Sequence, residues 1–191
     1  AGPTADVSAN AGNKPYNIEN VSPDAHLAPS VGDSSSKTSS KAWHKIDGVC
    51  YNGSGKKVEG AITRGMDISE WQGKINWKEA KKDLDFAFVR ISYGTRHLDD
   101  YYDYNMTEAE AADVPVGTYV YSLAKTNKEA LAEAQLAIRQ MQGHKVSYPV
   151  AFDLEDEATL GTLTRKEISQ IALTFCDEIR KAGYTPILYM N

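Results

Sequence analysis

Residues 65–191 alternate between strand-like and helix-like patterns, and this alternation limits the chain to a small set of folds. Asn76, Thr126 and Thr164 are each followed three residues later by Glu, which is typical of a helix N-terminus. Repeated βα units with short connections imply parallel strands joined by right-handed crossovers. The sequence therefore predicts an α/β fold, either a (β/α) barrel or an open doubly wound sheet. The expected strands cover residues 65–69, 86–92, 116–122, 149–155 and 186–190.

The polar residues of these strands favour the barrel. Because successive side chains of a strand point to opposite faces, Asp153 and Glu155 share a face opposite the aliphatic residues of their strand. A doubly wound sheet would bury these carboxylates beneath helices at a high desolvation cost, whereas a barrel places them at its C-terminal mouth. We therefore expect a TIM-like (β/α) barrel, incomplete and with five βα units. Its second face is predicted to carry Asp67, Ser69, Arg90, Ser92, Tyr119, Tyr121, Asp153, Glu155 and Tyr189.

The residues before this region have a different composition. Residues 1–40 contain one aromatic residue, Tyr16, and end in a Ser-rich stretch, so we expect a flexible linker or tail. In residues 41–64, the Asp47-Gly48 pair lies between apolar positions and predicts a β-hairpin. This segment resembles one degenerate copy of the aromatic and glycine repeats that attach wall enzymes to cell-wall polymers. A hairpin that only packs on the following domain remains the alternative.

Composition excludes several classes of function. The 21 Lys and Arg residues against 26 Asp and Glu give a net charge of −5, with both signs interspersed, which argues against nucleic-acid binding. No run of 18 apolar residues is present, so we expect no membrane span. Cys50 and Cys176 are too few for a disulfide framework, and their spacing fits no zinc site.

Three carboxylates form the candidate site. Asp153 and Glu155 lie two residues apart on one strand, and Asp67 comes from another strand at the same end of the expected barrel. Since negative charges held close together cannot all ionise freely, one carboxyl should keep its proton near neutral pH. An acid beside a carboxylate is suited to glycoside hydrolysis. Two alternatives stay open at this point: a divalent-metal site, and a salt-bridged cluster with Arg90 that only stabilises the fold.

Four separate motifs carry a resemblance to a known family. They are GMDISEWQG at residues 65–73, FAFVRISYG at 86–94, GTYVYS at 117–122 and VAFDLE at 150–155. In this order they resemble the first strands of family 25 glycoside hydrolases, the muramidases related to fungal, phage and bacterial lysozymes. The resemblance covers residues 65–191 and implies that they are the N-terminal part of such a catalytic domain. Because five strands are fewer than a barrel needs, we expect a longer enzyme whose later strands carry further site residues.

The resemblance also implies roles for individual residues. The reaction would be cleavage of the β-1,4 bond between N-acetylmuramic acid and N-acetylglucosamine in peptidoglycan, without a metal or organic cofactor. Glu155 would be the general acid. Asp153 would either stabilise the acetamido group of the substrate or attack directly, and Asp67 would support them. Residues expected to contact the substrate are Tyr119, Tyr121, Arg90 and Tyr189.

The setting of the protein follows from that substrate. Peptidoglycan lies outside the cell membrane, so we expect a secreted or wall-associated protein, acting as a monomer on glycan strands. A protein that binds wall glycan without cutting it, or an inactive fragment, is the competing hypothesis. A metal-dependent hydrolase is a third alternative.

Overall fold

The computed structural model describes residues 43–190, and it begins with a small hairpin. Strands β1 (His44–Ile46) and β2 (Val49–Tyr51) pair antiparallel, and the turn between them has positive φ at both Asp47 (48°) and Gly48 (80°). Positive φ at both central residues is the geometry that an Asp-Gly hairpin turn requires. Lys45 holds this hairpin to the rest of the chain, because its Nζ lies 2.9 Å from an Oδ2 of Asp85. The predicted linker, residues 1–40, lies outside the described residues.

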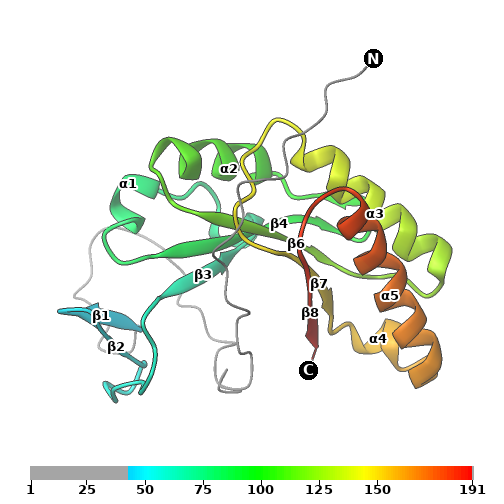
Figure 1. Ribbon diagram of the computed structural model, residues 1–191, viewed down its shortest axis with the longest axis horizontal. Helices are drawn as coiled ribbons and strands as arrows, with labels where there is room; N and C mark the ends of the chain where they lie inside the picture. The colour runs from blue at the N-terminus through cyan, green and yellow to red at the C-terminus, as the bar shows by residue number, and fades with distance from the viewer. Residues whose placement is uncertain (1–42, 191) are drawn as a thin grey trace.

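The main sheet contains all five strands that the sequence predicts. In spatial order they are β3 (Gly65–Ile68), β4 (Phe86–Tyr93), β6 (Val116–Tyr121), β7 (Val150–Leu154) and β8 (Pro186–Met190), and every neighbouring pair is parallel. The short strand β5 (His97–Leu98) pairs antiparallel with the end of β4. The fold is therefore α/β with a mostly parallel sheet, as expected. The predicted barrel is not confirmed, because this sheet is open, with β3 and β8 at its edges (Figure 1).

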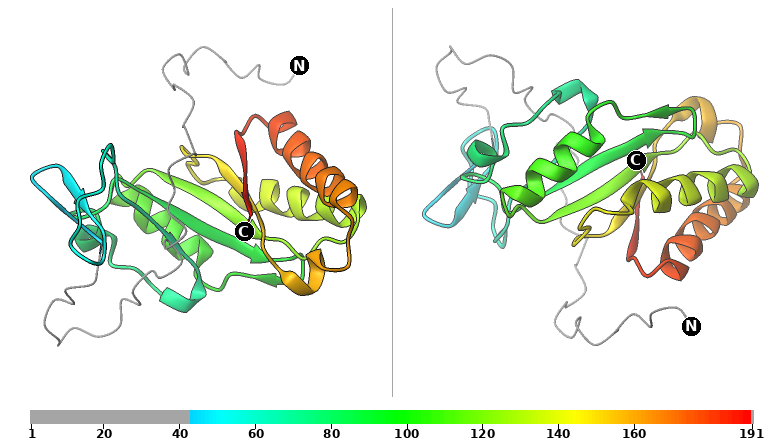
Figure 2. Two further views of the ribbon diagram at one scale, coloured as in Figure 1. Left: turned by 90° about the horizontal axis from the view of Figure 1, so that it is seen from below. Right: turned by 90° about the horizontal axis from the view of Figure 1, so that it is seen from above.

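The three long helices cover one face of the sheet. Helix α2 (Tyr102–Ala111) and helix α3 (Asn127–Met141) pack on β4 and β6, and helix α5 (Arg165–Lys181) packs on β7 and β8 (Figure 1). The opposite face is turned toward the viewer in the left panel of Figure 2, where the strands lie in front of α2 and α3. The shorter helical segments are η3 (Glu70–Gln72), α1 (Trp77–Ala80) and α4 (Glu157–Leu160). Among residues 43–190, no helix is long and apolar enough to cross a bilayer.

The helix ends follow the signals in the sequence. The predicted N-caps Asn76, Thr126 and Thr164 each accept a hydrogen bond from the backbone N–H of the Glu three residues later. The apolar stripe of α5 includes Phe175, whose ring stacks on Phe152 of β7 at a centroid distance of 4.0 Å. Cys176, beside this stripe, is buried and free, and burial raises the pKa of its thiol. The hydrophobic core therefore lies between the aliphatic face of the sheet and the helices.

A β-bulge in β4 changes the predicted division of that strand into faces. Arg90 pairs with Tyr119, but the register then shifts, so that Ser92 pairs with Val120 and Tyr93 with Tyr121. Paired residues of a sheet point to the same side, and Val120 belongs to the core. Strict alternation had placed Ser92 beside Arg90, and this prediction is wrong: Ser92 lies on the helix side, and Tyr93 takes its place on the open face. A bulge cannot be read from alternation because it adds one residue to the strand.

Aromatic rings fill the lower part of the open face, near the N-terminal ends of the strands. Phe86 stacks on Tyr148 at 4.8 Å between ring centroids, and Phe88 meets Tyr148 edge to face at 6.4 Å. Gly117 allows this close packing, because a Cβ there would lie 2.6 Å from the Phe88 ring and 2.5 Å from the carbonyl oxygen of Pro149. The polar residues of the open face therefore lie above an apolar floor.

A buried glutamate fastens the C-terminal end of β6 to α3. Glu133 is only 2% exposed. Its Oε2 accepts a hydrogen bond from Ser122 Oγ at 2.7 Å, and its Oε1 accepts one from the Leu123 N–H at 3.0 Å. The Ser122 N–H in turn donates to the carbonyl oxygen of Asp153 at 2.9 Å. Burial raises the pKa of Glu133 to about 7, although both hydrogen bonds oppose this shift.

We expect Glu133 to make the stability of the fold depend on pH. Its folded-state pKa lies above the ordinary 4.5, so the native state holds this proton to higher pH than the unfolded state. The free energy of unfolding should therefore fall between about pH 4.5 and pH 7, by on the order of 3 kcal/mol from this group. In Glu133→Gln, thermal melts at pH 5 and pH 8 should differ less than in the parent chain. An unchanged difference would contradict the assignment.

Candidate active site

The parallel strands bring the predicted site residues to the open face of the sheet. Tyr121 on β6 pairs with Asp153 on β7, and Asp153 pairs with Tyr189 on β8. These three side chains therefore form a row across neighbouring strands at the C-terminal end of the sheet. Tyr119 on β6 lies on the same face one step closer to the floor, and Asp67 on β3, which pairs with Phe88, lies on this face at the level of the floor. The alternation of β7 places Glu155, directly after the strand, on this face too.

Asp153 is the carboxylate with the most unusual surroundings. It is 8% exposed, and its Oδ1 has no hydrogen-bond partner among the described residues. Burial, followed by the negative charges of Glu155 and Asp67, raises the pKa of Asp153 from the ordinary 3.8 to about 7, and the positive charge of Arg90 opposes this shift. A buried carboxyl oxygen without a hydrogen-bond partner, in a group with a raised pKa, marks a candidate functional residue. The sequence prediction of one carboxyl protonated near neutral pH thus applies to Asp153.

The pKa values of two tyrosines depend on the charges of the three acids. Burial and then the charge of Asp67 raise the pKa of Tyr119 above its ordinary value, with a smaller contribution from Asp153. Burial and then the charge of Glu155 raise the pKa of Tyr121 to about 12. Charges shift a pKa in this way only across several ångströms. The charges of Asp67, Asp153 and Glu155 thus act on two tyrosines of the open face.

Glu155 lies at the rim of a pocket of about 380 Å³. The residue after it, Asp156, caps helix α4, because its Oδ1 accepts a hydrogen bond from the Thr159 N–H at 2.7 Å. This cap begins the four-residue helix α4 directly beyond Glu155, and residues of this helix line the pocket together with Glu155. The pocket is lined by Glu155, Glu157, Leu160 and Gly161.

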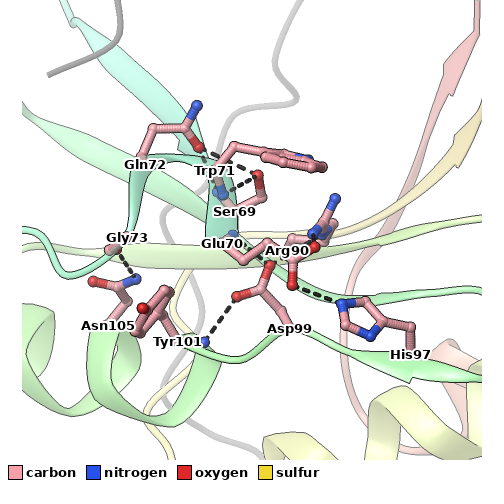
Figure 3. Close-up of polar contacts among 10 residues, drawn as sticks. All are labelled: Ser69, Glu70, Trp71, Gln72, Gly73, Arg90, His97, Asp99, Tyr101 and Asn105. Carbon is pink, nitrogen blue, oxygen red and sulfur yellow. Dashed lines mark hydrogen bonds and ion pairs between the residues drawn. The ribbon is translucent and has the colours of Figure 1, made fainter. Parts of the chain in front are cut away.

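Arg90 lies in an ion-pair cluster with Glu70 and Asp99 (Figure 3). Its Nη2 is 2.8 Å from Glu70 Oε1, and its Nε donates a hydrogen bond to Asp99 Oδ2 at 3.0 Å. The Arg90 side chain is buried, and its charge reaches Asp153 as described above. The alternative hypothesis paired Arg90 with the site carboxylates. In the structure Arg90 pairs with Glu70 and Asp99, while Oδ1 of Asp153 has no hydrogen-bond partner among the described residues.

The loop after β3 is built around the same cluster. Asp99 Oδ2 also accepts the Glu70 N–H at 2.7 Å, and Glu70 Oε2 lies 2.6 Å from His97 Nε2 (Figure 3). The hydrogen bond from His97, helped by the charge of Arg90, holds the pKa of Glu70 below its usual range. Ser69, predicted on the open face, caps η3: its Oγ accepts a hydrogen bond from the Trp71 N–H, and its own N–H donates to Gln72 Oε1. These bonds fix the backbone that follows Asp67.

The cluster also contains the best-placed metal ligands among residues 43–190. Glu70, His97 and Asp100 bring one ligand atom each within 4.8 Å of one another. However, the Arg90 guanidinium already contacts Glu70, and its positive charge would oppose a cation there. This group includes none of the three site carboxylates.

Sequence reasoning missed several residues around the site. Tyr93 joins the open face only because of the bulge in β4, and its ring stacks on Tyr121 at 4.8 Å between centroids. Asp99 comes from a loop and Glu70 from η3. A buried arginine needs nearby carboxylates, and that requirement was a usable signal. Trp71 on η3 is 81% exposed, which is unusual for so large an apolar ring.

Comparison with known proteins decides the family. The sequence profile of Glycosyl hydrolases family 25 matches residues 66–191, about two thirds of the chain. The chain belongs to glycosyl hydrolase family 25. The family match begins in β3 and includes every residue of the candidate site, so the resemblance carried by the four sequence motifs is confirmed.

Two relatives of this family 25 chain align with it over segments of different length. The uncharacterized protein YegX of Escherichia coli strain K12 is 26% identical over 132 residues, which cover 65% of this chain and 47% of YegX. Lysozyme M1 of Streptomyces globisporus is 37% identical over 60 residues, covering 31% of this chain and 20% of that protein. The chain thus spans about half the length of YegX.

A solved structure of the family shares the fold. The modular autolysin LytC from Streptococcus pneumoniae superposes with a TM-score of 0.65 at 26% identity, covering 78% of this chain and 37% of LytC. LytC has also been solved in complex with a synthetic peptidoglycan ligand. The covered share exceeds the two thirds of the chain formed by residues 65–191, so the likeness extends into residues before Gly65.

Proposed function

We propose that the protein is a peptidoglycan hydrolase that cleaves the β-1,4 bond between N-acetylmuramic acid and N-acetylglucosamine. The observation that carries this proposal is the group formed by Asp153, Glu155 and Asp67 around two tyrosines, with a buried carboxyl whose pKa is raised to about 7. Membership of family 25 and the likeness to an autolysin and a lysozyme support the same reaction.

The three carboxylates would have different tasks. Glu155, at the rim of the pocket, would donate a proton to the glycosidic oxygen as the bond breaks. Asp153, deeper in the face, would first release its proton to solvent, and its carboxylate would then either hold the acetamido group of the substrate or attack the anomeric carbon. A water molecule would finally add to the anomeric carbon and return a proton to Glu155. Asp67 would keep negative charge beside the same centre and so help to stabilise the positive charge of the transition state.

Other residues would bind and orient the glycan. Tyr119, Tyr121 and Tyr189 each offer a flat apolar face with a hydroxyl group, which suits a sugar ring. Arg90 was predicted to contact the substrate. Because Glu70 and Asp99 hold its guanidinium, we propose that Arg90 acts as a fixed positive charge beside Asp153.

The remaining expectations describe the protein around this site. We propose that residues 65–191 form part of a (β/α) barrel and that the hairpin within residues 41–64 is a wall-binding element joined to a flexible segment, residues 1–40. The likeness to a modular autolysin supports this arrangement. A protein with this substrate would work outside the cell or in the wall, as a monomer on glycan strands.

The release of reducing sugars from purified peptidoglycan tests the proposal. The full chain should generate new reducing ends, and EDTA should leave the rate unchanged, because none of the proposed steps uses a metal. Binding without new reducing ends would favour the glycan-binding alternative. Activity that EDTA abolishes and added zinc or magnesium restores would favour a metal-dependent hydrolase.

A further inference from the structure

Tyr93 stands on the open face because of a costly irregularity in β4. The bulge between Arg90 and Ser92 places Ser92 on the helix side, fully buried. There the Ser92 Oγ has no hydrogen-bond partner among the described residues. Burying an unpaired hydroxyl and interrupting a strand ladder are both destabilising. Regular alternation would avoid both costs, but it would point Tyr93 into the helix layer. Bulges that re-aim a side chain are common beside active sites.

The re-aimed ring forms a flat surface with its neighbour. The rings of Tyr93 and Tyr121 stack with centroids 4.8 Å apart and an interplanar angle of 18°. Tyr93 stays 38% exposed although Tyr121 covers one side of its ring. Part of Tyr93 therefore remains accessible to a ligand at this end of the sheet.

The strand register places this surface at a fixed distance from the carboxylates. Tyr93 pairs with Tyr121, and Tyr121 pairs with Asp153, so Tyr93 is two strands away from Asp153 at the same level of the sheet. Neighbouring strands are about 4.8 Å apart, which puts Tyr93 roughly 10 Å from Asp153 along the row. A sugar next to the one at the carboxylates would reach this position.

From this geometry we propose that Tyr93, backed by Tyr121, forms an aromatic shelf that binds an N-acetylated hexosamine ring of the glycan next to the bond being cleaved. The apolar C–H face of the sugar would lie on the exposed side of Tyr93, and the phenol hydroxyl would remain free for polar groups at the edge of the sugar ring. This inference rests on the proposed function, because it assigns a further binding position to the same site. Tyr93 would contribute to binding and not to the chemical step.

Substitutions at Tyr93 test the shelf through binding and kinetics. Calorimetry with a peptidoglycan tetrasaccharide, in the non-cleaving Glu155→Gln background, should show that Tyr93→Leu and Tyr93→Ala raise the Kd roughly three- to tenfold. Tyr93→Phe, which keeps the ring, should stay within about twofold. In the otherwise unsubstituted chain, the same changes should raise KM by similar factors and leave kcat nearly unchanged.

A control variant separates the shelf from general loss of aromatic surface. Tyr104 lies on α2, where Lys74 Nζ sits 4.9 Å from the centroid of its ring. Tyr104→Ala should therefore leave the Kd unchanged. Tyr93→Leu keeps an apolar side chain packed against Tyr121 and so is less disruptive to the fold than Tyr93→Ala. Thermal melts of each variant would show whether it is still folded.

The outcomes distinguish the shelf from the function on which it rests. A chain that cleaves peptidoglycan, with an equal Kd for the parent, Tyr93→Leu and Tyr93→Ala, would overturn the shelf and leave the proposed function intact. A lower melting temperature without a change in Kd would reduce Tyr93 to a packing residue. A parent chain that neither binds nor cleaves the glycan would overturn both inferences.

Discussion

Glu155→Gln is expected to lower the rate of glycan cleavage by about 10²–10⁴-fold, the usual contribution of a general acid. Glutamine has the shape of glutamate but carries no proton that it can donate to the leaving oxygen. Glu155 lies at the rim of its pocket, and the substitution leaves the neighbouring walls unchanged. The Kd for peptidoglycan should therefore stay within a few-fold of the parent value. The measurement is the initial rate of reducing-end release, with binding to insoluble peptidoglycan measured in parallel.

The matched control is Glu110→Gln, an exposed glutamate of α2 on the other side of the sheet. It makes the same chemical change away from the site and should leave the rate unaltered. Equal rates for Glu155→Gln and Glu110→Gln would remove Glu155 from the catalytic mechanism. Loss of binding together with activity in Glu155→Gln would indicate instead that this glutamate holds the substrate.

Asp153→Asn should lower the rate by about 10²–10³-fold, the range seen when one charge-stabilising group is removed from an active site. Both proposed roles of Asp153 require a carboxylate, which an amide cannot replace. The pKa of about 7 adds a pH signature. In the parent chain, activity should fall as the pH is lowered through about 7, because Asp153 takes up its proton. The remaining activity of Asp153→Asn should lack this acidic limb, and an unchanged pH profile would contradict the assignment.

The same substitution should not weaken the fold. The pKa of Asp153 is raised in the folded state, so its ionisation disfavours the native state increasingly from about pH 3.8 to about pH 7. Asparagine removes this cost, and the melting temperature of Asp153→Asn at pH 8 should equal or exceed that of the parent chain. Lost activity without lost stability is the pattern of a functional residue. A strongly destabilised variant would indicate that Asp153 has a mainly structural role.

Local patterns were enough to predict most of the framework. The caps at Asn76, Thr126 and Thr164 were readable because a helix N-terminus uses a short, fixed spacing. The prediction that Asp153 and Glu155 share a face rests on the two-residue period of a strand, and the structure places Asp153 in β7 with Glu155 directly after it. Asp67 could be added because parallel strands place their C-terminal ends at the same edge of the sheet.

Features that depend on distant parts of the chain could not be predicted. The bulge in β4 is a response to its pairing with β6, so alternation alone assigned Ser92 to the wrong face and overlooked Tyr93. The partners of Arg90 were missed because Asp99 lies beyond β4 and Glu70 follows another strand. Whether the sheet closes also depends on strand pairing, and here β3 and β8 remain its edges.

The identity of the sugar at the new reducing end tests the central claim most directly. Peptidoglycan digested with the full chain can be reduced with borohydride, hydrolysed and analysed by mass spectrometry. If Glu155, Asp153 and Asp67 act together on the bond after N-acetylmuramic acid, reduction should yield muramitol, and Glu155→Gln should yield almost none. Glucosaminitol as the main product, or equal muramitol from the parent and Glu155→Gln, would contradict this account of the site.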